Sequence, residues 1–169
     1  HYMSLDPLWR PFNHDNLTFS FFYAFSERFL LPISHDEVAH GKGSLINKMP
    51  GNYDNKFAGV RAFITYMYAH PGKKLVFMGS EIGQFDEWDF DSGIQWDLLD
   101  YDKHRKLFEF FKAINKFYAE NKPLFELDST AEGFQWIHKN DFTQSVISFR
   151  RTDAQGNEII AVCNFQPVS

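Results

Sequence analysis

The chain has 169 residues, of which 44% are hydrophobic and 23% are charged, and its formal net charge at pH 7 is −5. This length and composition suit one globular domain, or one domain with part of a second. The acidic balance argues against nucleic-acid binding, which requires a basic surface, and the lack of any run of ~18 apolar residues argues against a membrane span.

The first predicted element is a helix over residues 15–28. Its apolar side chains recur at helical spacing, and Asp15 or Asn16 is available as an N-terminal cap. A short apolar run without alternation follows at residues 29–33. Such a run is typical of a strand that is buried on both faces in a parallel sheet, although Pro32 favours an edge, an end or a bulge.

Residues 34–55 are polar and rich in glycine and lysine, which predicts a long loop with a turn of helix near Ser44–Lys48. Residues 54–70 have the periodicity of a longer helix, which ends at the strong breaker His70-Pro71-Gly72. A second buried strand is predicted at residues 74–78. Strand, loop, helix, turn and strand in this order make a βαβ unit, so the two strands should be parallel.

After a second polar loop at residues 86–97, a long helix is predicted from Asp102 to Asn121, and Lys122-Pro123 ends it. The pattern then changes to short strands joined by polar turns, which resembles the start of an antiparallel sandwich. We therefore expect a domain boundary near residues 122–132. The predicted strands cover residues 133–137, 145–150 and 158–164.

The single cysteine, Cys163, lies in the last apolar run. It cannot form a disulfide within the chain, so we expect a buried structural thiol and a reducing, cytoplasmic location. No basic segment followed by an apolar one opens the chain, so no signal peptide is expected. The chain begins with His1 instead of Met, and one explanation is that it is cut from a longer protein.

The densest polar cluster, Ser34-His35-Asp36-Glu37, comes directly after the first predicted strand. In parallel α/β folds the residues at the carboxyl ends of strands face the functional site. His35 and Asp36 are therefore candidates to hold a polar substrate. The alternative is a structural turn in which the aspartate caps the backbone.

Two further clusters follow the second predicted strand. Gly79–Gln84 contains Glu81 and would reach the same rim as His35, although Glu81 could instead be a carboxylate at a helix N-terminus. Phe85–Asp91 interleaves acidic groups with aromatic rings. This combination suits sugars, which offer hydroxyl groups at their edges and C–H groups on their faces. The alternative is a solvated loop that is pinned by Trp88.

No metal site is expected. His35 and His40 are five residues apart, whereas a zinc-binding helix needs histidines at i and i+4. The acidic residues of Glu87–Asp91 imitate the start of a calcium loop, but its twelfth position would be Leu98 instead of glutamate. The sequence has no phosphate-binding glycine loop and no Gly-x-Ser-x-Gly motif, and no cofactor is expected.

The segment Leu30–Leu45, with Ser34-His35-Asp36-Glu37-Val38 near its start, closely resembles the fourth signature region of glycogen branching enzymes, which belong to the alpha-amylase family of glycoside hydrolases. Other segments along nearly the whole chain resemble the same family. They are Met49–Gly51, Tyr66–Lys74, Phe77–Gly79, Glu81, Gly83–Gln84, Glu87–Trp88, Leu98–Leu99, His104–Arg105, Glu132–Ile137 and Val162–Phe165.

The resemblance implies an α/β fold. Residues 1–122 would be the C-terminal part of a (β/α)8 TIM barrel, comprising its last two βα units, and residues 123–169 would begin a C-terminal antiparallel β-sandwich. The implied reaction is cleavage of an α-1,4-glucan chain and its transfer to a 6-hydroxyl, which forms an α-1,6 branch by retaining double displacement. The implied partners are an α-glucan, such as glycogen or amylose, and the rest of the parent enzyme.

By the same resemblance, His35 and Asp36 would stabilise an oxocarbenium-like transition state. The carboxylate nucleophile and the acid/base of this family follow the fourth and fifth barrel strands, which would precede His1. The segment alone is therefore expected to be inactive, and its unpaired strand edges should make it self-associate. Further candidates for substrate binding are Glu37, Lys42, Glu81, Gln84 and Trp88.

The sequence departs from the family at Ser80 and Ile82, where Asn and Phe are expected, so the details of that rim loop could differ. Two alternatives stay open. A related alpha-amylase-type hydrolase or debranching enzyme shares the His-Asp pair, and only the flanking residues favour branching. A non-catalytic glucan-binding module would show affinity for glucan without turnover.

Overall fold

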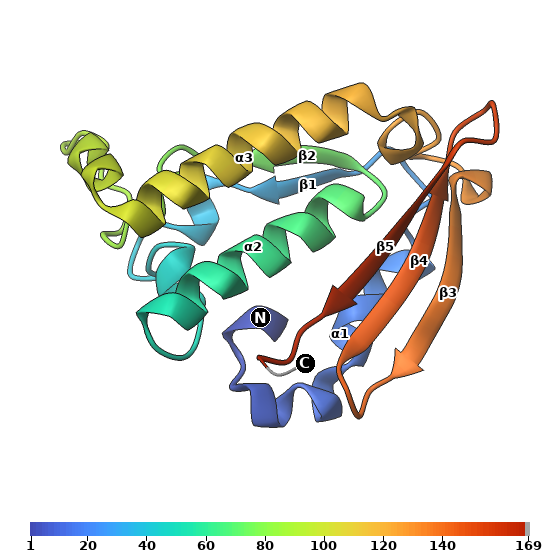
Figure 1. Ribbon diagram of the computed structural model, residues 1–169, viewed down its shortest axis with the longest axis horizontal. Coiled ribbons are helices and arrows are strands. Elements are labelled where there is room, and N and C mark those ends of the chain that lie inside the picture. The colour runs from blue at the N-terminus through green and yellow to red at the C-terminus, as the bar shows by residue number, and fades with distance from the viewer. Residues whose placement is uncertain (168–169) are drawn as a thin grey trace.

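The computed structural model describes residues 1–167 (Figure 1). Two long helices run side by side along a pair of parallel strands, and an antiparallel sheet stands next to them. The helices are α1 (Asp15–Thr18), α2 (Tyr53–Ala69) and α3 (Asp102–Glu120). The strands are β1 (Leu30–Ile33), β2 (Lys73–Val76), β3 (Phe134–Asp141), β4 (Val146–Thr152) and β5 (Glu158–Asn164).

The predicted βαβ unit is confirmed. The side chain of Asn52 accepts a hydrogen bond from the backbone N–H of Asn55 (3.0 Å) and so begins α2. The helix ends before Pro71 and Gly72, and Gly72 has a φ of 110°, which glycine adopts easily. The chain then returns as β2, which lies parallel to β1. Both strands therefore end at the same edge of the sheet.

The expectation that these strands are buried on both faces is wrong. Leu30 of β1 is 52% exposed and Leu75 of β2 is 42% exposed. Within residues 1–167, β1 and β2 pair only with each other, and only one of their faces is covered by α2 and α3. The position of Pro32 inside β1 agrees with an edge strand, where a missing N–H donor costs little.

The predicted helix over residues 15–28 is also wrong in its length. The helix α1 ends at Thr18, and a 3-10 turn, Phe19–Phe22, follows it. Aromatic residues have modest helix propensity, and Phe21 packs its ring against Phe134 of β3 at a centroid distance of 4.4 Å. This contact with the antiparallel sheet overrides the helical periodicity of the segment.

The helix and the three strands predicted in the second half of the chain are confirmed. The helix α3 buries Leu107 and Phe111 beside α2. After it, β3, β4 and β5 form an antiparallel sheet with β4 in the centre. Cys163 of β5 is buried, and this burial raises the pKa of its thiol to about 11, so it is the structural cysteine that we expected.

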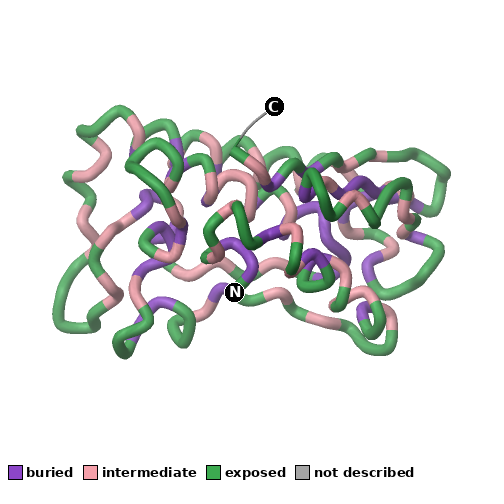
Figure 2. Tube along the Cα trace, turned by 90° about the horizontal axis from the view of Figure 1, so that it is seen from below, coloured by how far each residue is buried: buried purple, intermediate pink, exposed green. Residues whose placement is uncertain are grey.

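One hydrophobic core joins the two halves. Ile147 and Phe149 of β4 are fully buried and belong to the same cluster as Val60 and Ile64 of α2. Figure 2 shows the buried parts of the trace running through the interior, with exposed turns around them. The N-terminal segment closes this core, because the guanidinium of Arg10 donates hydrogen bonds to the backbone carbonyl of Phe165 and to that of Met3 (3.3 Å).

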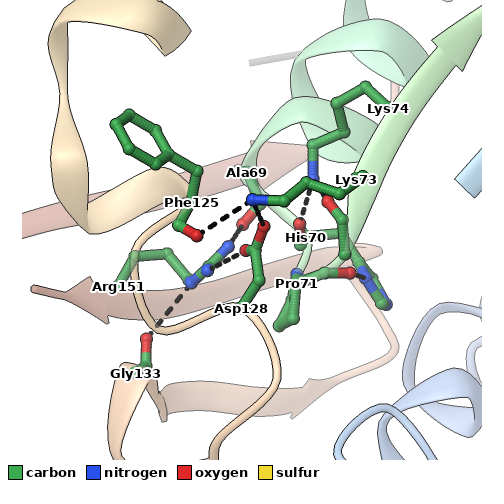
Figure 3. Close-up of polar contacts among 10 residues, drawn as sticks. Ala69, His70, Pro71, Lys73, Lys74, Phe125, Asp128, Gly133 and Arg151 are labelled. Carbon is green, nitrogen blue, oxygen red and sulfur yellow. Dashed lines mark hydrogen bonds and ion pairs between the residues drawn. The ribbon is translucent and has the colours of Figure 1, made fainter. Parts of the chain in front are cut away.

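A buried polar cluster lies where α2, β2 and the antiparallel sheet meet (Figure 3). Arg151 of β4 is fully buried and donates to the carbonyls of Ala69 (2.8 Å) and Gly133 (3.1 Å) and to the carboxylate of Asp128 (2.6 Å). The ammonium of Lys73 lies 3.2 Å from the other oxygen of Asp128. This arginine therefore connects β4 to residues 128–133 and to the distant end of α2.

His70 is buried next to this cluster in its neutral form. Its Nδ1 donates to the carbonyl of Pro71 (2.7 Å), so Nε2 accepts the hydrogen bond from the hydroxyl of Ser20 (2.7 Å). Burial lowers the pKa of His70 to about 4, and the nearby ammonium of Lys74 and guanidinium of Arg151 act in the same direction. Burial likewise lowers the pKa of Lys74 to about 7.

Replacing Arg151 by alanine should destabilise the fold by about 3–5 kcal/mol, because Asp128 loses its buried partner and two buried carbonyls lose their donor. The matched control is Arg150→Ala. Arg150 is the next residue along β4, and its ion pair with Glu158 (2.7 Å) is exposed, so this change should cost at most about 1 kcal/mol. Urea unfolding measures the free energy of unfolding of both variants. Equal losses would contradict the stabilising role of the buried arginine.

Stability should fall as the pH is lowered from 6.5 toward 4. In this window the unfolded chain binds a proton at His70 and the folded chain does not, so the free energy of unfolding decreases by up to about 3 kcal/mol. In His70→Gln this contribution should disappear from the pH profile, whereas in the exposed-site control His138→Gln it should remain. Urea unfolding at a series of pH values tests this, and identical slopes for wild type and His70→Gln would refute it.

Candidate functional site

Two loops meet at the carboxyl ends of the parallel strands. We call residues 34–52 the β1 loop and residues 77–101 the β2 loop. The backbone N–H of Trp88 in the β2 loop donates to the carbonyl of Val38 in the β1 loop (3.0 Å). The hydroxyl of Ser44 donates to the carbonyl of Phe85 (3.0 Å). These cross-loop hydrogen bonds fasten the loops into one rim, as the parallel strand order predicted.

His35 and Asp36 open the β1 loop in a single 3-10 turn, His35–Glu37. The Nε2 atom of His35 lies 3.2 Å from a carboxylate oxygen of Asp36, and the two side chains are 54% and 66% exposed. The ring of Phe77 lies 6.2 Å from that of His35, and the ring of Trp88 lies 5.3 Å from that of Phe77. An exposed polar pair is therefore backed by aromatic rings from the β2 loop.

Glu37 and Lys42 lie beside this pair. The ammonium of Lys42 donates to the backbone carbonyl of Asp36. Both residues line a groove of about 670 Å3, which runs between the β1 loop, the end of β1 and the N-terminal residues 1–4. A groove of this size can hold a small-molecule segment. Its lining is mostly apolar, and Glu37 and Lys42 lie at its border with the His35–Asp36 pair.

Glu81 and Gln84 are placed differently. The side-chain oxygen of Gln84 accepts a hydrogen bond from the backbone N–H of Gln95 (3.2 Å), so this side chain organises its own loop. Gln84 and Trp88 also line a small hollow between the two loops. In the described part of the chain, no recorded hydrogen bond or ion pair joins Glu81 or Gln84 to His35 or Asp36.

Of the candidate residues, His35, Asp36, Lys42 and Trp88 lie together at the rim. Glu37 follows Asp36 and faces the groove, whereas Glu81 and Gln84 belong to the neighbouring turn of the β2 loop. Within residues 1–167, no three histidine, cysteine, aspartate or glutamate side chains are grouped so that they could hold a metal ion. None of the helices described here is both long and apolar enough to cross a membrane.

Two residues that sequence analysis missed shape this rim. The carboxylate of Glu87 accepts hydrogen bonds from the backbone N–H groups of Gly41 (3.0 Å) and Gly43 (2.9 Å). These bonds lower the pKa of Glu87. The ammonium of Lys48 donates to the carbonyls of Lys42 (2.7 Å) and Gly43 (3.0 Å). The paired glycines of the β1 loop were the available signal, since they allow backbone N–H groups to turn toward an acceptor.

No family model matches the chain. The chain is 56% identical over 168 residues to the 1,4-alpha-glucan branching enzyme GlgB of Aquifex aeolicus (strain VF5), and the match covers 99% of this chain and 27% of that protein. For the enzyme of the same name from Halothermothrix orenii, the identity is 52% and the match covers 98% of this chain and 26% of that protein. For the one from Francisella philomiragia, these values are 52%, 99% and 27%.

The chain thus spans about a quarter of the length of the curated relatives that it matches. The match covers nearly every residue of this chain, and so includes the motifs that suggested the family. The resemblance is confirmed, and the chain is homologous over almost its whole length to a segment of the 1,4-alpha-glucan branching enzymes.

Proposed function

We propose that this chain forms one side of the active site of a 1,4-alpha-glucan branching enzyme, which cleaves an α-1,4-glucan and transfers the cut chain to a 6-hydroxyl. The observation that carries the proposal is the exposed His35–Asp36 pair at the end of a parallel strand. Its surroundings fit a neutral sugar, because donors, acceptors and aromatic rings lie together there. The names of the relatives support the same reaction.

In this mechanism His35 and Asp36 bind hydroxyl groups of the sugar at the cleaved bond. Their hydrogen bonds strengthen as positive charge develops on the ring, so they favour the transition state over the bound substrate. Trp88 and Phe77 offer apolar surface to the C–H faces of the sugar. The nucleophile and the acid/base, which retaining enzymes hold about 5 Å apart, come from the rest of the parent enzyme.

The proposed fold is the end of a (β/α)8 barrel at residues 1–122, followed by the beginning of a β-sandwich at residues 123–169. The βαβ order and the parallel register of β1 and β2 support the barrel. Exposed apolar side chains on these strands and on the N-terminal segment support packing against further barrel elements. A cytoplasmic location fits the single buried cysteine.

The chain on its own should self-associate, because β1 offers an unpaired edge and Leu30, Leu75 and Met78 are exposed. Sedimentation velocity should detect species larger than a monomer. Replacing Leu30 and Leu75 together by lysine should shift the population toward monomer, since charges on an edge oppose pairing. A wild-type chain that stays monomeric at all concentrations would contradict the barrel proposal.

His35→Ala in the full-length protein should lower kcat for branching of amylose about 100- to 1,000-fold, the usual cost of losing one transition-state hydrogen bond. The exposed position of His35 means that the free energy of unfolding should change by less than about 0.5 kcal/mol. The control is His138→Ala, an exposed histidine on β3. Normal branching by His35→Ala would refute its role.

Product analysis separates the proposed reaction from its alternatives. Branching of amylose weakens iodine staining and creates α-1,6 linkages, whereas a hydrolase or debranching enzyme creates reducing ends without new branches. A glucan-binding module would bind amylose and leave it unchanged. Since the chain lacks the nucleophile and the acid/base in this mechanism, branching by the isolated chain would contradict the division of roles.

A further inference from the structure

Glu87 reaches from the β2 loop into the backbone of the β1 loop. One carboxylate oxygen accepts the N–H of Gly41 (3.0 Å), and the other accepts the N–H of Gly43 (2.9 Å). The next residue, Trp88, adds a backbone hydrogen bond to Val38 (3.0 Å). The contact is therefore a bidentate bridge between the two loops, placed a few residues after His35 and Asp36.

The backbone of the β1 loop is shaped for this bridge. His40, Gly41 and Gly43 have φ values of 61°, 80° and 73°, which lie in the left-handed region. Such a conformation turns neighbouring N–H groups to one side, where they form a concave site for an anion. Here each of the two N–H groups has its own acceptor atom, because a carboxylate supplies two oxygens. A carboxamide supplies one, because its nitrogen is a donor.

The opposite side of the same backbone is held by lysine. The ammonium of Lys48 donates to the carbonyls of Glu37, Lys42 (2.7 Å) and Gly43 (3.0 Å). The ammonium of Lys42 donates to the carbonyl of Asp36. Lys48 therefore binds the carbonyl groups of this loop, and the Glu87 carboxylate takes the place of solvent at the N–H groups of Gly41 and Gly43.

We infer that Glu87 is a positioning residue for the branching reaction: by binding the N–H groups of Gly41 and Gly43, it fixes the β1 loop and so holds His35 and Asp36 in reach of the sugar. This inference rests on the proposed function. Glu87 acts through the backbone and does not itself contact the substrate. Its two N–H bonds also lower the pKa of its carboxyl group, so the bridge stays ionised at neutral pH.

The test is Glu87→Gln in the full-length protein. The variant keeps one acceptor, so one glycine N–H loses its partner. We expect kcat for branching of amylose to fall about 10- to 100-fold, the usual effect of a small displacement of catalytic groups, while KM and the melting temperature stay close to wild type. Amide hydrogen exchange in a peptide spanning residues 38–45 should become faster.

The matched control is Glu109→Gln, which removes an exposed carboxylate that is paired with Lys112 on α3. It should leave kcat and the exchange of residues 38–45 unchanged. Glu87→Asp is the second variant. It keeps both acceptor oxygens on a shorter side chain, so its kcat should lie between those of wild type and Glu87→Gln. If Glu87→Gln does not fold, the kcat of Glu87→Asp tests the positioning role of Glu87 instead.

A Glu87→Gln enzyme with wild-type kcat would overturn the inference, and so would a loss that appears entirely in KM. The proposed function fails separately, if the wild-type full-length protein does not branch amylose or if His35→Ala is fully active. A wild type that branches, with an impaired His35→Ala and an unimpaired Glu87→Gln, would leave the proposed function standing and refute the positioning role alone.

Discussion

The parallel pairing of β1 with β2 determines where every candidate residue lies. The helix α2 carries the chain back so that Leu30 pairs with Lys73 and Ile33 pairs with Val76. Because the strands run in the same direction, the loops that follow them leave from one edge of the sheet. Hydrogen bonds between loops then become feasible, and they give His35 and Asp36 a defined backbone although their side chains are exposed.

The sequence predicted the elements with a strong local signal. Residues 54–70 combine helical periodicity with a breaker at Pro71, and the helix forms within one residue of both predicted limits. The positions of His35 and Asp36 followed from a single rule, that polar residues at the carboxyl ends of parallel strands gather at one rim. The helix depends mainly on contacts between residues that are near in the sequence, whereas the rim position of His35 and Asp36 also needs the pairing of β1 with β2.

What could not be predicted depends on distant partners. Residues 15–28 have the periodicity of a helix, yet Phe21 packs against Phe134, more than a hundred residues away, and the helix stops at Thr18. The bridge from Glu87 to Gly41 and Gly43 also joins residues that are distant in the sequence. The glycines indicate a turned backbone, but no local pattern identifies Glu87 as its acceptor. Burial of β1 and β2 on both faces failed as a prediction because, within residues 1–167, these strands pair only with each other.

The buried arginine has a consequence for how the chain unfolds. Arg151 ties the end of α2 to Asp128 and to β4, and one continuous core lies on both sides of that contact. Opening the antiparallel sheet alone would expose the guanidinium, the carboxylate and the apolar face of α2 together. The helical and sheet portions should therefore melt as one cooperative unit, and a protease cut near residues 122–132 should not yield two independently stable pieces.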